Sequence, residues 1–333
     1  MTEYESKAIL HQIQLERVEN GIVRKCLLQL ENASRQLAKE IKKTSGVYTK
    51  KRYQEIRKYI KDVSKELKAN INTDMDIDAF IEYELEAQVK LYKKYGGVNM
   101  VVPSKEQVIT TATFTPYTAT STFENYLESF ELGFFNVWDS QVRAGYINGL
   151  TTQAIVKSVM GEVAKDAQVA DFGALHQLRN SIMTNTRTAL QSFASETRNL
   201  IYRNNSELID GYKWVATLDR RTCIYCGQME SKTYPTLEAI GDTPPAHYNC
   251  RCTVIPIIKG YDELDEDDTR ASMNGYVDGK ITFEEWLENQ SADVQKDVLG
   301  VTRYKMFQNG ENLSHFVSDN RILTIAELKA IEA

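Results

Sequence analysis

The chain has 333 residues, of which 42% are hydrophobic and 26% charged, and its formal net charge is −6. This composition is ordinary for a globular protein of about two domains, and it excludes a chain that is disordered throughout. No stretch approaches the roughly 18 uninterrupted apolar residues of a membrane span, and the acidic start Met1-Thr-Glu-Tyr-Glu is unlike a signal peptide, so we expect a protein made in the cytoplasm without membrane contact.

Residues 1–97 have the pattern of long helices. Apolar residues recur every three or four positions over Ile9–Ile41 and again over Ile56–Leu67, with a break at Thr44-Ser-Gly46. A further helix is predicted over Ile77–Tyr95, where a Gly-Gly pair follows as a stop signal. The pattern indicates a helical N-terminal domain with stripes that face a core or a partner.

The chain is electrically polarised. Lys39–Lys68 holds eleven Lys or Arg against four Asp or Glu, whereas Tyr261–Ala333 holds sixteen acids against seven bases. A basic helix can contact DNA phosphates or an acidic partner, but a solvated helix face explains the same run, because acidic residues interrupt it. The candidate nucleic-acid or partner contacts are Lys50, Lys51, Arg52, Arg57, Lys58 and Lys61.

The middle of the chain is predicted to be a linker followed by more helices. Residues 98–122 are rich in Thr and contain two prolines, which indicates a linker. Helices resume at Phe123, and Thr151 is placed to cap a later one. His176–Arg203 has the pattern of one long amphipathic helix.

The most informative stretch is a cluster of cysteines and one histidine. Four of the five cysteines and one of the four histidines fall between Cys223 and Cys252. A Cys-x2-Cys pair and a His-x2-Cys pair each present two ligands at short spacing, which suits a tetrahedral ion, and thiolate with imidazole favours zinc. The candidate ligands are Cys223, Cys226, His247 and Cys250, with Cys252 able to exchange with Cys250 because residues two apart in an extended segment point to the same side.

Other interpretations of these cysteines stay open. In an oxidising medium they would form two disulfides, and they can also be small buried apolar residues. A cytoplasmic protein keeps its thiols reduced and available to a metal. With four soft ligands the coordination sphere closes, so we expect a structural zinc ion rather than a catalytic one.

Two short strands are predicted on either side of the metal loop. Tyr212–Leu218 and Cys252–Ile258 are rich in aromatic and β-branched residues with partial alternation. Asp219, just before the first cysteine pair, is placed to cap the turn or to accept a hydrogen bond behind the ligands. The expected fold is mainly α with a small α+β region: a helical N-terminal domain and a C-terminal domain with a zinc-knuckle-like loop between two short strands.

The residues around the cluster carry a family resemblance. The motifs are Trp214-Val-Ala-Thr-Leu-Asp219, Arg221-Thr-Cys-x2-Cys226, Pro244-Pro-Ala-His247 and Cys250-Arg-Cys252, followed in order by Thr282-Phe-Glu-Glu-Trp286-Leu, Val298-Leu-Gly-Val-Thr-Arg303 and Ala326-Glu-Leu328. Together they resemble the phage head morphogenesis proteins, the Mu F-like minor head family. The resemblance covers about half the chain, from near Gly149 to the end, and the N-terminal third shows no comparable motif. Arg187 looks like the arginine of that family's helix before the metal region, and if buried it would need an acidic partner.

The resemblance implies a virion protein, present in few copies near the portal, that serves head morphogenesis, DNA packaging or DNA ejection. Its implied partners are the portal protein and capsid proteins, with double-stranded DNA as a further candidate. The sequence patterns together with the resemblance predict a helical domain at 1–97, a linker at 98–122, a minor-head-like domain at 123–260 and an acidic helical tail at 261–333.

The alternative is a zinc-dependent DNA-binding protein or nuclease acting in the host. The sequence contains no phosphate-binding loop, nucleophile elbow or His-Glu-x2-His motif. We therefore expect a protein that is not an enzyme. His176 and His315 lie at no ligand spacing to other candidates, so neither is expected to bind the metal.

Overall fold

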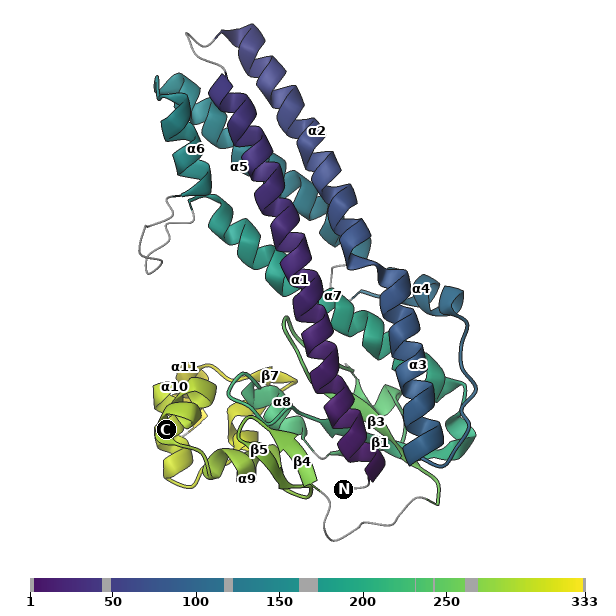
Figure 1. The fold of residues 1–333 in the computed structure, drawn as a ribbon. Helices are drawn as coiled ribbons and strands as arrows, with labels where there is room; N and C mark the ends of the chain where they lie inside the picture. The colour runs from purple at the N-terminus through teal and green to yellow at the C-terminus, as the bar shows by residue number, and fades with distance from the viewer. Residues whose placement is uncertain are drawn as a thin grey trace. The chain divides into compact units, whose positions relative to one another are not determined.

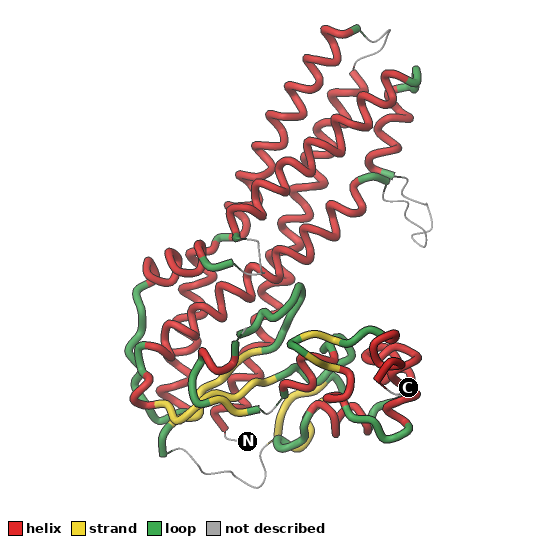
Figure 2. Tube along the Cα trace, turned by 180° about the vertical axis from the view of Figure 1, so that it is seen from behind, coloured by secondary structure: helices red, strands yellow, loops and turns green. Residues whose placement is uncertain are grey.

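The computed structural model describes residues 3–43, 49–116, 122–161, 173–230, 232–241, 243–260 and 269–331. In these ranges the chain is mainly helical with a few short strands, which confirms the coarse fold class expected from the sequence (Figures 1 and 2). Among the residues so described, every helix is too short or too polar to span a bilayer.

Three helices occupy the N-terminal part: α1 (Glu3–Lys43), α2 (Lys50–Met75) and α3 (Ile77–Tyr95). Their apolar stripes are buried as the spacing predicts, and α3 has the predicted bounds. Thr49 caps α2 by accepting a hydrogen bond from the backbone N–H of Arg52. The helix break expected at Thr44–Gly46 lies outside the described residues.

A short helix, α4 (Lys105–Phe114), lies inside the segment 98–122 that was predicted to be a linker. Ser104 Oγ accepts a hydrogen bond from Gln107 N at 3.2 Å, and Gln107 Oε1 accepts one from Ser104 N at 2.9 Å. This reciprocal pair satisfies two N–H groups that a helix start leaves open. The helix follows from a Ser-x-x-Gln signal that the Thr and Pro content obscured.

Three helices follow: α5 (Phe123–Ile147), α6 (Thr152–Met160) and α7 (Leu175–Arg203). The predicted cap Thr151 is confirmed, because its side chain accepts a hydrogen bond from Ala154 N. The long helix α7 matches the amphipathic stretch expected over His176–Arg203 within one residue.

The three-stranded sheet holds the Cys/His loop. Strand β1 (Ile209–Val215) lies between β2 (Thr233–Tyr234) and β3 (Thr253–Ile258) and is antiparallel to both. Strands β1 and β3 are labelled in Figure 1. Both long strands are largely buried, which suits their aromatic and β-branched residues. The prediction of two strands that bracket the loop is confirmed, and β1 begins three residues earlier than expected.

The described C-terminal residues, 269–331, hold two hairpins as well as the expected helices. The remaining elements are β4 (Thr269–Ser272), β5 (Gly275–Asp278), α9 (Phe283–Glu288), α10 (Ala292–Gln308), β6 (Val317–Ser318), β7 (Arg321–Ile322) and α11 (Ile325–Ile331), with short 3-10 turns at Ser206–Leu208, Glu238–Ile240 and Leu313–Phe316. Phe283, Trp286 and Phe316 are buried in one apolar cluster with Leu218 and Ile224 of the Cys/His loop. The tail therefore packs on the loop that carries the cysteines. The acidic stretch 261–268 lies outside the described residues.

The chain divides into two compact units built from separated stretches. Unit 1 comprises Met1–Glu16, Ile81–Ala112 and Gln191–Ala333, and unit 2 comprises Arg17–Phe80 and Thr113–Leu190. Long helices such as α1 and α7 contribute to both units. The consecutive domains inferred from the sequence stay a prediction. They would be units that fold independently, and a compact unit in the structure does not have to fold independently.

Candidate metal centre

The first ligand pair lies at the start of a short helix. Helix α8 (Ile224–Met229) begins after Cys223, whose Sγ accepts a hydrogen bond from Cys226 N at 3.4 Å. Cys223 thus occupies the position where Ser or Asp caps other helices. The helical turn brings the side chains of Cys223 and Cys226 to the same side, with Cys226 buried and Cys223 partly buried.

The second ligand pair lies in the turn before β3. Cys250 N donates to His247 O at 3.1 Å, and Asn249 adopts a left-handed backbone with φ of 58°. Asparagine tolerates this conformation better than most residues. Cys250 and Cys252 are buried, and Cys252 immediately precedes β3, which fixes its position.

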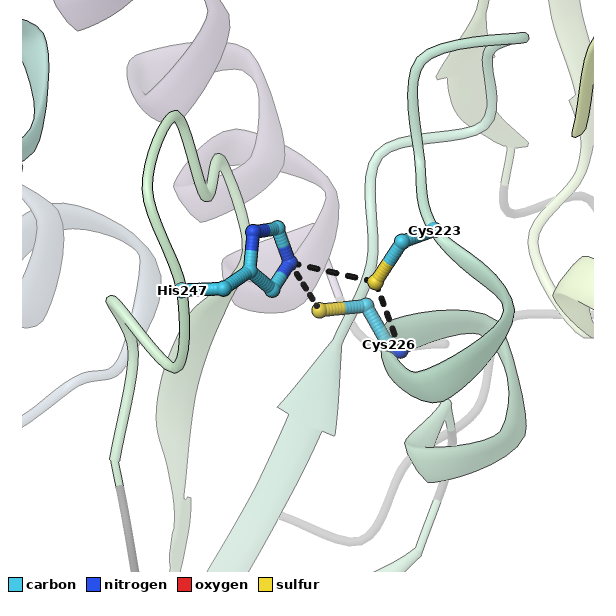
Figure 3. Close-up of side chains that lie close together, drawn as sticks. All are labelled: Cys223, Cys226 and His247. Carbon is cyan, nitrogen blue, oxygen red and sulfur yellow. Dashed lines mark hydrogen bonds between the residues drawn. The ribbon is translucent and has the colours of Figure 1, made fainter. Parts of the chain in front are cut away.

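All five predicted ligands come together in the structure. His247 Nε2 lies 3.1 Å from Cys223 Sγ and 3.2 Å from Cys226 Sγ (Figure 3), and Cys226 Sγ lies 3.9 Å from Cys250 Sγ. Two groups of ligand atoms each lie within 4.8 Å: Cys223, Cys226 and His247 in one, and Cys226, Cys250 and Cys252 in the other. Cys226 is common to both groups, and the choice between Cys250 and Cys252 stays open.

None of the five cysteines, all of which lie in described ranges, forms a disulfide. The fifth, Cys26, is fully buried in α1 and belongs to neither ligand group. The four clustered cysteines are thus thiols in this structure.

The imidazole of His247 is oriented for a cation. Its Nδ1 lies 2.9 Å from the carbonyl oxygen of Tyr248. Because a carbonyl can only accept, Nδ1 carries the hydrogen, and in the neutral ring Nε2 then holds the lone pair. Nε2 is the atom that contacts the two sulfurs of Cys223 and Cys226 (Figure 3). A backbone carbonyl behind a histidine ligand is a common way to fix this orientation.

The local electrostatics favour the thiolate form at Cys223 and Cys250, whereas hydrogen bonds with these two residues raise the pKa of Cys226 well above its usual value, and the pKa of Cys252 is raised as well. The pKa of Cys223 is lowered to about 5, chiefly by a hydrogen bond from Cys226 and then by contact with His247. A hydrogen bond from Cys226 also holds the pKa of Cys250 well below its usual range. Hydrogen bonds to Cys223 and Cys250 raise the pKa of His247 to about 11. Thiolates are the metal-binding form of cysteine, and a cation bound at Nε2 would displace a proton.

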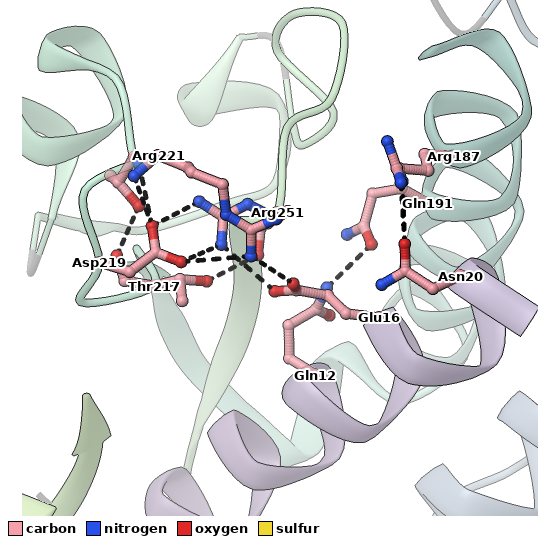
Figure 4. A network of polar contacts seen from close by, with 10 residues as sticks. Gln12, Glu16, Asn20, Arg187, Gln191, Thr217, Asp219, Arg221 and Arg251 are labelled. Atoms are coloured by element: carbon pink, nitrogen blue, oxygen red, sulfur yellow. Dashed lines mark hydrogen bonds and ion pairs between the residues drawn. The ribbon is translucent and has the colours of Figure 1, made fainter. Parts of the chain in front are cut away.

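A salt bridge ties the two ligand pairs to each other. The carboxylate of Asp219 accepts hydrogen bonds from the backbone N–H groups of Arg221 (2.8 Å) and Thr222 (3.2 Å), so its predicted role as a cap is confirmed. The same carboxylate accepts two hydrogen bonds from the guanidinium of Arg251, one of them at 2.6 Å (Figure 4). Since Arg251 lies between Cys250 and Cys252, this pair joins the two halves of the site without using a ligand atom.

Helices α1 and α7 support the second ligand pair from within unit 1. Glu16 of α1 lies 3.6 Å from Arg251, and Gln191 of α7 donates to the carbonyl oxygen of Cys252 at 3.0 Å. Gln12 in turn donates to Gln191 at 2.8 Å (Figure 4). These contacts join residues far apart in the sequence, so no local pattern could have predicted them.

On α7, Arg198 is a buried arginine with an acidic partner. Its guanidinium lies 2.7 Å from the fully buried Glu84, which also contacts His11 at 2.6 Å. Arg187, for which the sequence suggested such a partner, is only partly buried and donates two hydrogen bonds to Asn20, at 3.1 and 2.9 Å (Figure 4).

The basic candidate residues all lie on α2. Lys50, Lys51, Arg57, Lys58 and Lys61 are exposed and Arg52 is partly buried. Arg57 pairs with Asp139 of α5 at 3.3 Å, so it serves contacts within unit 2. The two other histidines have contacts outside the ligand groups: His176 lies 3.1 Å from Asn180, and His315 lies 2.9 Å from Glu311.

The donor set fits a soft cation. Within the described residues, neither ligand group contains a carboxylate, and together they offer four sulfurs and one imidazole nitrogen. Such donors select zinc over hard cations, and four of them complete a tetrahedral sphere with no position for water. The residues present therefore fit a structural metal ion better than a catalytic one.

Residues 139–255 match the family model described as Phage Mu protein F like protein. This segment runs from α5 to β3 and includes Asp219, Arg251 and all five candidate ligands. The match confirms the resemblance inferred from the motifs and supports a phage head protein of the minor head family. It ends before the C-terminal motifs, which lie at 282–328. No curated protein and no solved structure matches the chain.

Proposed function

We propose that this protein is a phage minor head protein that acts near the portal and whose Cys/His loop holds one structural zinc ion. The observation that carries the proposal is the convergence of five soft donor atoms inside the segment that matches the phage Mu F-like family. The virion is its proposed place of action, and the portal and capsid proteins are its proposed partners.

The proposed role of the zinc ion is to hold a region with little regular structure. Among its described residues, the loop between β1 and β3 contains only the short helix α8, the two-residue strand β2 and one 3-10 turn. Small regions of this kind often need a metal because their apolar core is limited. When bound, the ion would supply bonds that fix the two ligand pairs to each other. Cys223 and Cys226 would hold it from α8, and His247 with Cys250 or Cys252 would hold it from the turn before β3.

The partner proposal is tested by purification from infected cells. A tagged chain is expected to copurify with portal subunits and to be present in mature particles at low copy number. A free pool that is absent from particles would contradict a role in the virion.

We further infer that the protein acts without catalysis. The closed soft-donor set leaves no position for an activated water, which a zinc-dependent nuclease would need. Pure protein incubated with plasmid and magnesium or zinc is expected to leave the DNA intact. Cleavage that His247→Ala abolishes would support the nuclease alternative instead.

A further inference from the structure

Helices α2 and α5 border an open groove of about 650 Å³ in unit 2. One wall is basic and comes from α2, and the other presents apolar and acidic side chains from α5. The residues that matter here are Arg57, Lys58, Lys61 and Lys68 on α2, with Leu132 and Phe135 on α5. Lys61 is four residues from Arg57, three from Lys58 and seven from Lys68, and Leu132 is three from Phe135, so the residues of each helix gather on the side that borders the groove.

Some charged side chains of this groove already pair with each other across the two helices. Lys68 pairs with Glu131 at 3.3 Å, and Arg57 pairs with Asp139 and lies over the ring of Phe135. These contacts join the two helices, so the charges of Arg57 and Lys68 are not available to a ligand.

Two cations and one aliphatic side chain remain available. Lys58 and Lys61 are exposed and have no ion pair among the described residues, and Leu132 is 58% exposed. The two lysines lie three residues apart, which is roughly 5 Å along the helix. A complementary ligand therefore needs neighbouring anionic groups together with a large apolar group.

An acidic peptide meets these requirements better than a nucleic acid. The lining carries four basic side chains against Glu128 and Glu131, and Glu131 is paired with Lys68, so the groove stays net basic and suits an anionic ligand. Leu132 gains from burial under an apolar side chain, which a phosphate backbone does not offer.

The chain itself contains a peptide of this chemistry. Residues 261–268 read Tyr-Asp-Glu-Leu-Asp-Glu-Asp-Asp, with six acids around Leu264. We propose that the α2–α5 groove of one copy binds the 261–268 segment of a second copy. Because groove and segment are different surfaces, the contact is head-to-tail, and one copy can bind two neighbours.

A labelled peptide of residues 259–270 tests the groove directly, with fluorescence anisotropy on the full chain. Wild type is expected to bind the peptide, and Lys58→Glu with Lys61→Glu is expected to weaken binding at least about tenfold through lost pairing and new repulsion. A Leu264→Ser peptide should also bind more weakly. The matched control is Lys51→Glu with Lys65→Glu, an equal charge change on exposed α2 residues outside the groove.

If both double variants lost the same peptide affinity, the loss would come from net charge alone, and the proposal would be overturned. No binding of the peptide to wild type would overturn it as well. The proposal would also be overturned if a short DNA duplex, and not the peptide, bound to wild type and lost affinity in the Lys58/Lys61 variant.

Sedimentation of the full chain tests whether the contact joins two copies. Above the Kd of the peptide, wild type is expected to self-associate, whereas the Lys58/Lys61 variant and a variant with Asp265→Asn, Glu266→Gln and Asp267→Asn should each stay monomeric. An equimolar mixture of the two variants should form dimers and no larger species. Each pair has one intact groove and one intact segment, so only one contact can form. A wild type that stays monomeric, or a mixture that forms no dimer, would contradict the proposal.

Discussion

Asp219 acts on the candidate site without being a ligand. Its carboxylate caps the turn before Cys223 and also accepts two hydrogen bonds from Arg251 between the later cysteines. The Asp219–Arg251 salt bridge can hold the two pairs of candidate ligands in place before a metal binds. Metal binding would then lose less conformational entropy. The sequence predicted that Asp219 caps the turn. It did not predict the pairing of Asp219 with Arg251, because these two residues are 32 positions apart.

The first prediction concerns this pair. Asp219→Asn keeps an oxygen for the two backbone N–H groups but loses the charge that pairs with Arg251. We expect the Kd for zinc to rise roughly 10- to 100-fold, as for other residues that support ligands, in competition with a chromophoric chelator. Asp297→Asn, which removes an exposed partner of Arg220, should leave the Kd unchanged. An Asp219 variant with wild-type affinity would mean that the salt bridge does not organise the site.

The second prediction concerns Glu84 and pH. Burial alone would raise the pKa of this carboxyl, but the charges of Arg198 and His11 outweigh it and lower the pKa to about 2. A folded-state pKa below the usual value of 4.5 contributes stability above that value, and the contribution is lost as pH falls toward 2. Glu84→Gln should therefore cost about 3–5 kcal/mol near pH 7, because Arg198 would lose its buried partner.

Urea unfolding at pH 7, 5 and 3 provides the measurement. The difference in free energy of unfolding between wild type and Glu84→Gln should hold between pH 7 and 5 and shrink by pH 3. A difference that is constant over this range would show that the ionised carboxylate is not the source of the stability.

At the scale of elements, helix α8 connects the site to the C-terminal tail. A Cβ at Gly227, next to Cys226, would lie 2.3 Å from Cδ1 of Phe283 in α9. The glycine thus permits the close approach of α8 to the apolar cluster around Trp286. The sequence shows a glycine after the Cys-x2-Cys pair, but only the tertiary contact gives its reason.

The third prediction follows from this contact. Gly227→Ala should lower stability by about 1–3 kcal/mol through overpacking against Phe283, measured as a drop in Tm. Gly21→Ala in α1 is the control, because its Cβ would meet nothing within 4 Å and alanine favours a helix by up to about 1 kcal/mol. A Gly227 variant as stable as wild type would show that α8 and α9 can separate without cost.

Elements with a local signal were predictable and those without one were not. The period of apolar residues gave α3 and α7, and Thr151 gave the start of α6. The β4–β5 hairpin was missed because it has four residues in each strand and neither strand shows a clear apolar alternation. The five candidate ligands could be named from the sequence because of their short spacing, whereas the supporting contacts of Glu16 and Gln191 depend on tertiary packing.

The proposed metal ion lies in a chain whose match to the phage Mu F-like family model ends at residue 255. The residues beyond that point pack on the metal loop through Leu218 and Ile224. Loss of the ion is therefore expected to destabilise both the loop and the tail that covers it, while the helices of unit 2 keep their own core.

The most direct test combines elemental analysis with thermal melting before and after chelation. Cys226→Ser is the decisive variant because Cys226 belongs to both ligand groups, and Cys26→Ser is the control because Cys26 belongs to neither. We predict about one zinc ion per chain in wild type and in the control, a lower Tm after chelation, and loss of the ion in Cys226→Ser. Wild-type protein that carries no zinc and melts at the same temperature with and without chelator would contradict the account.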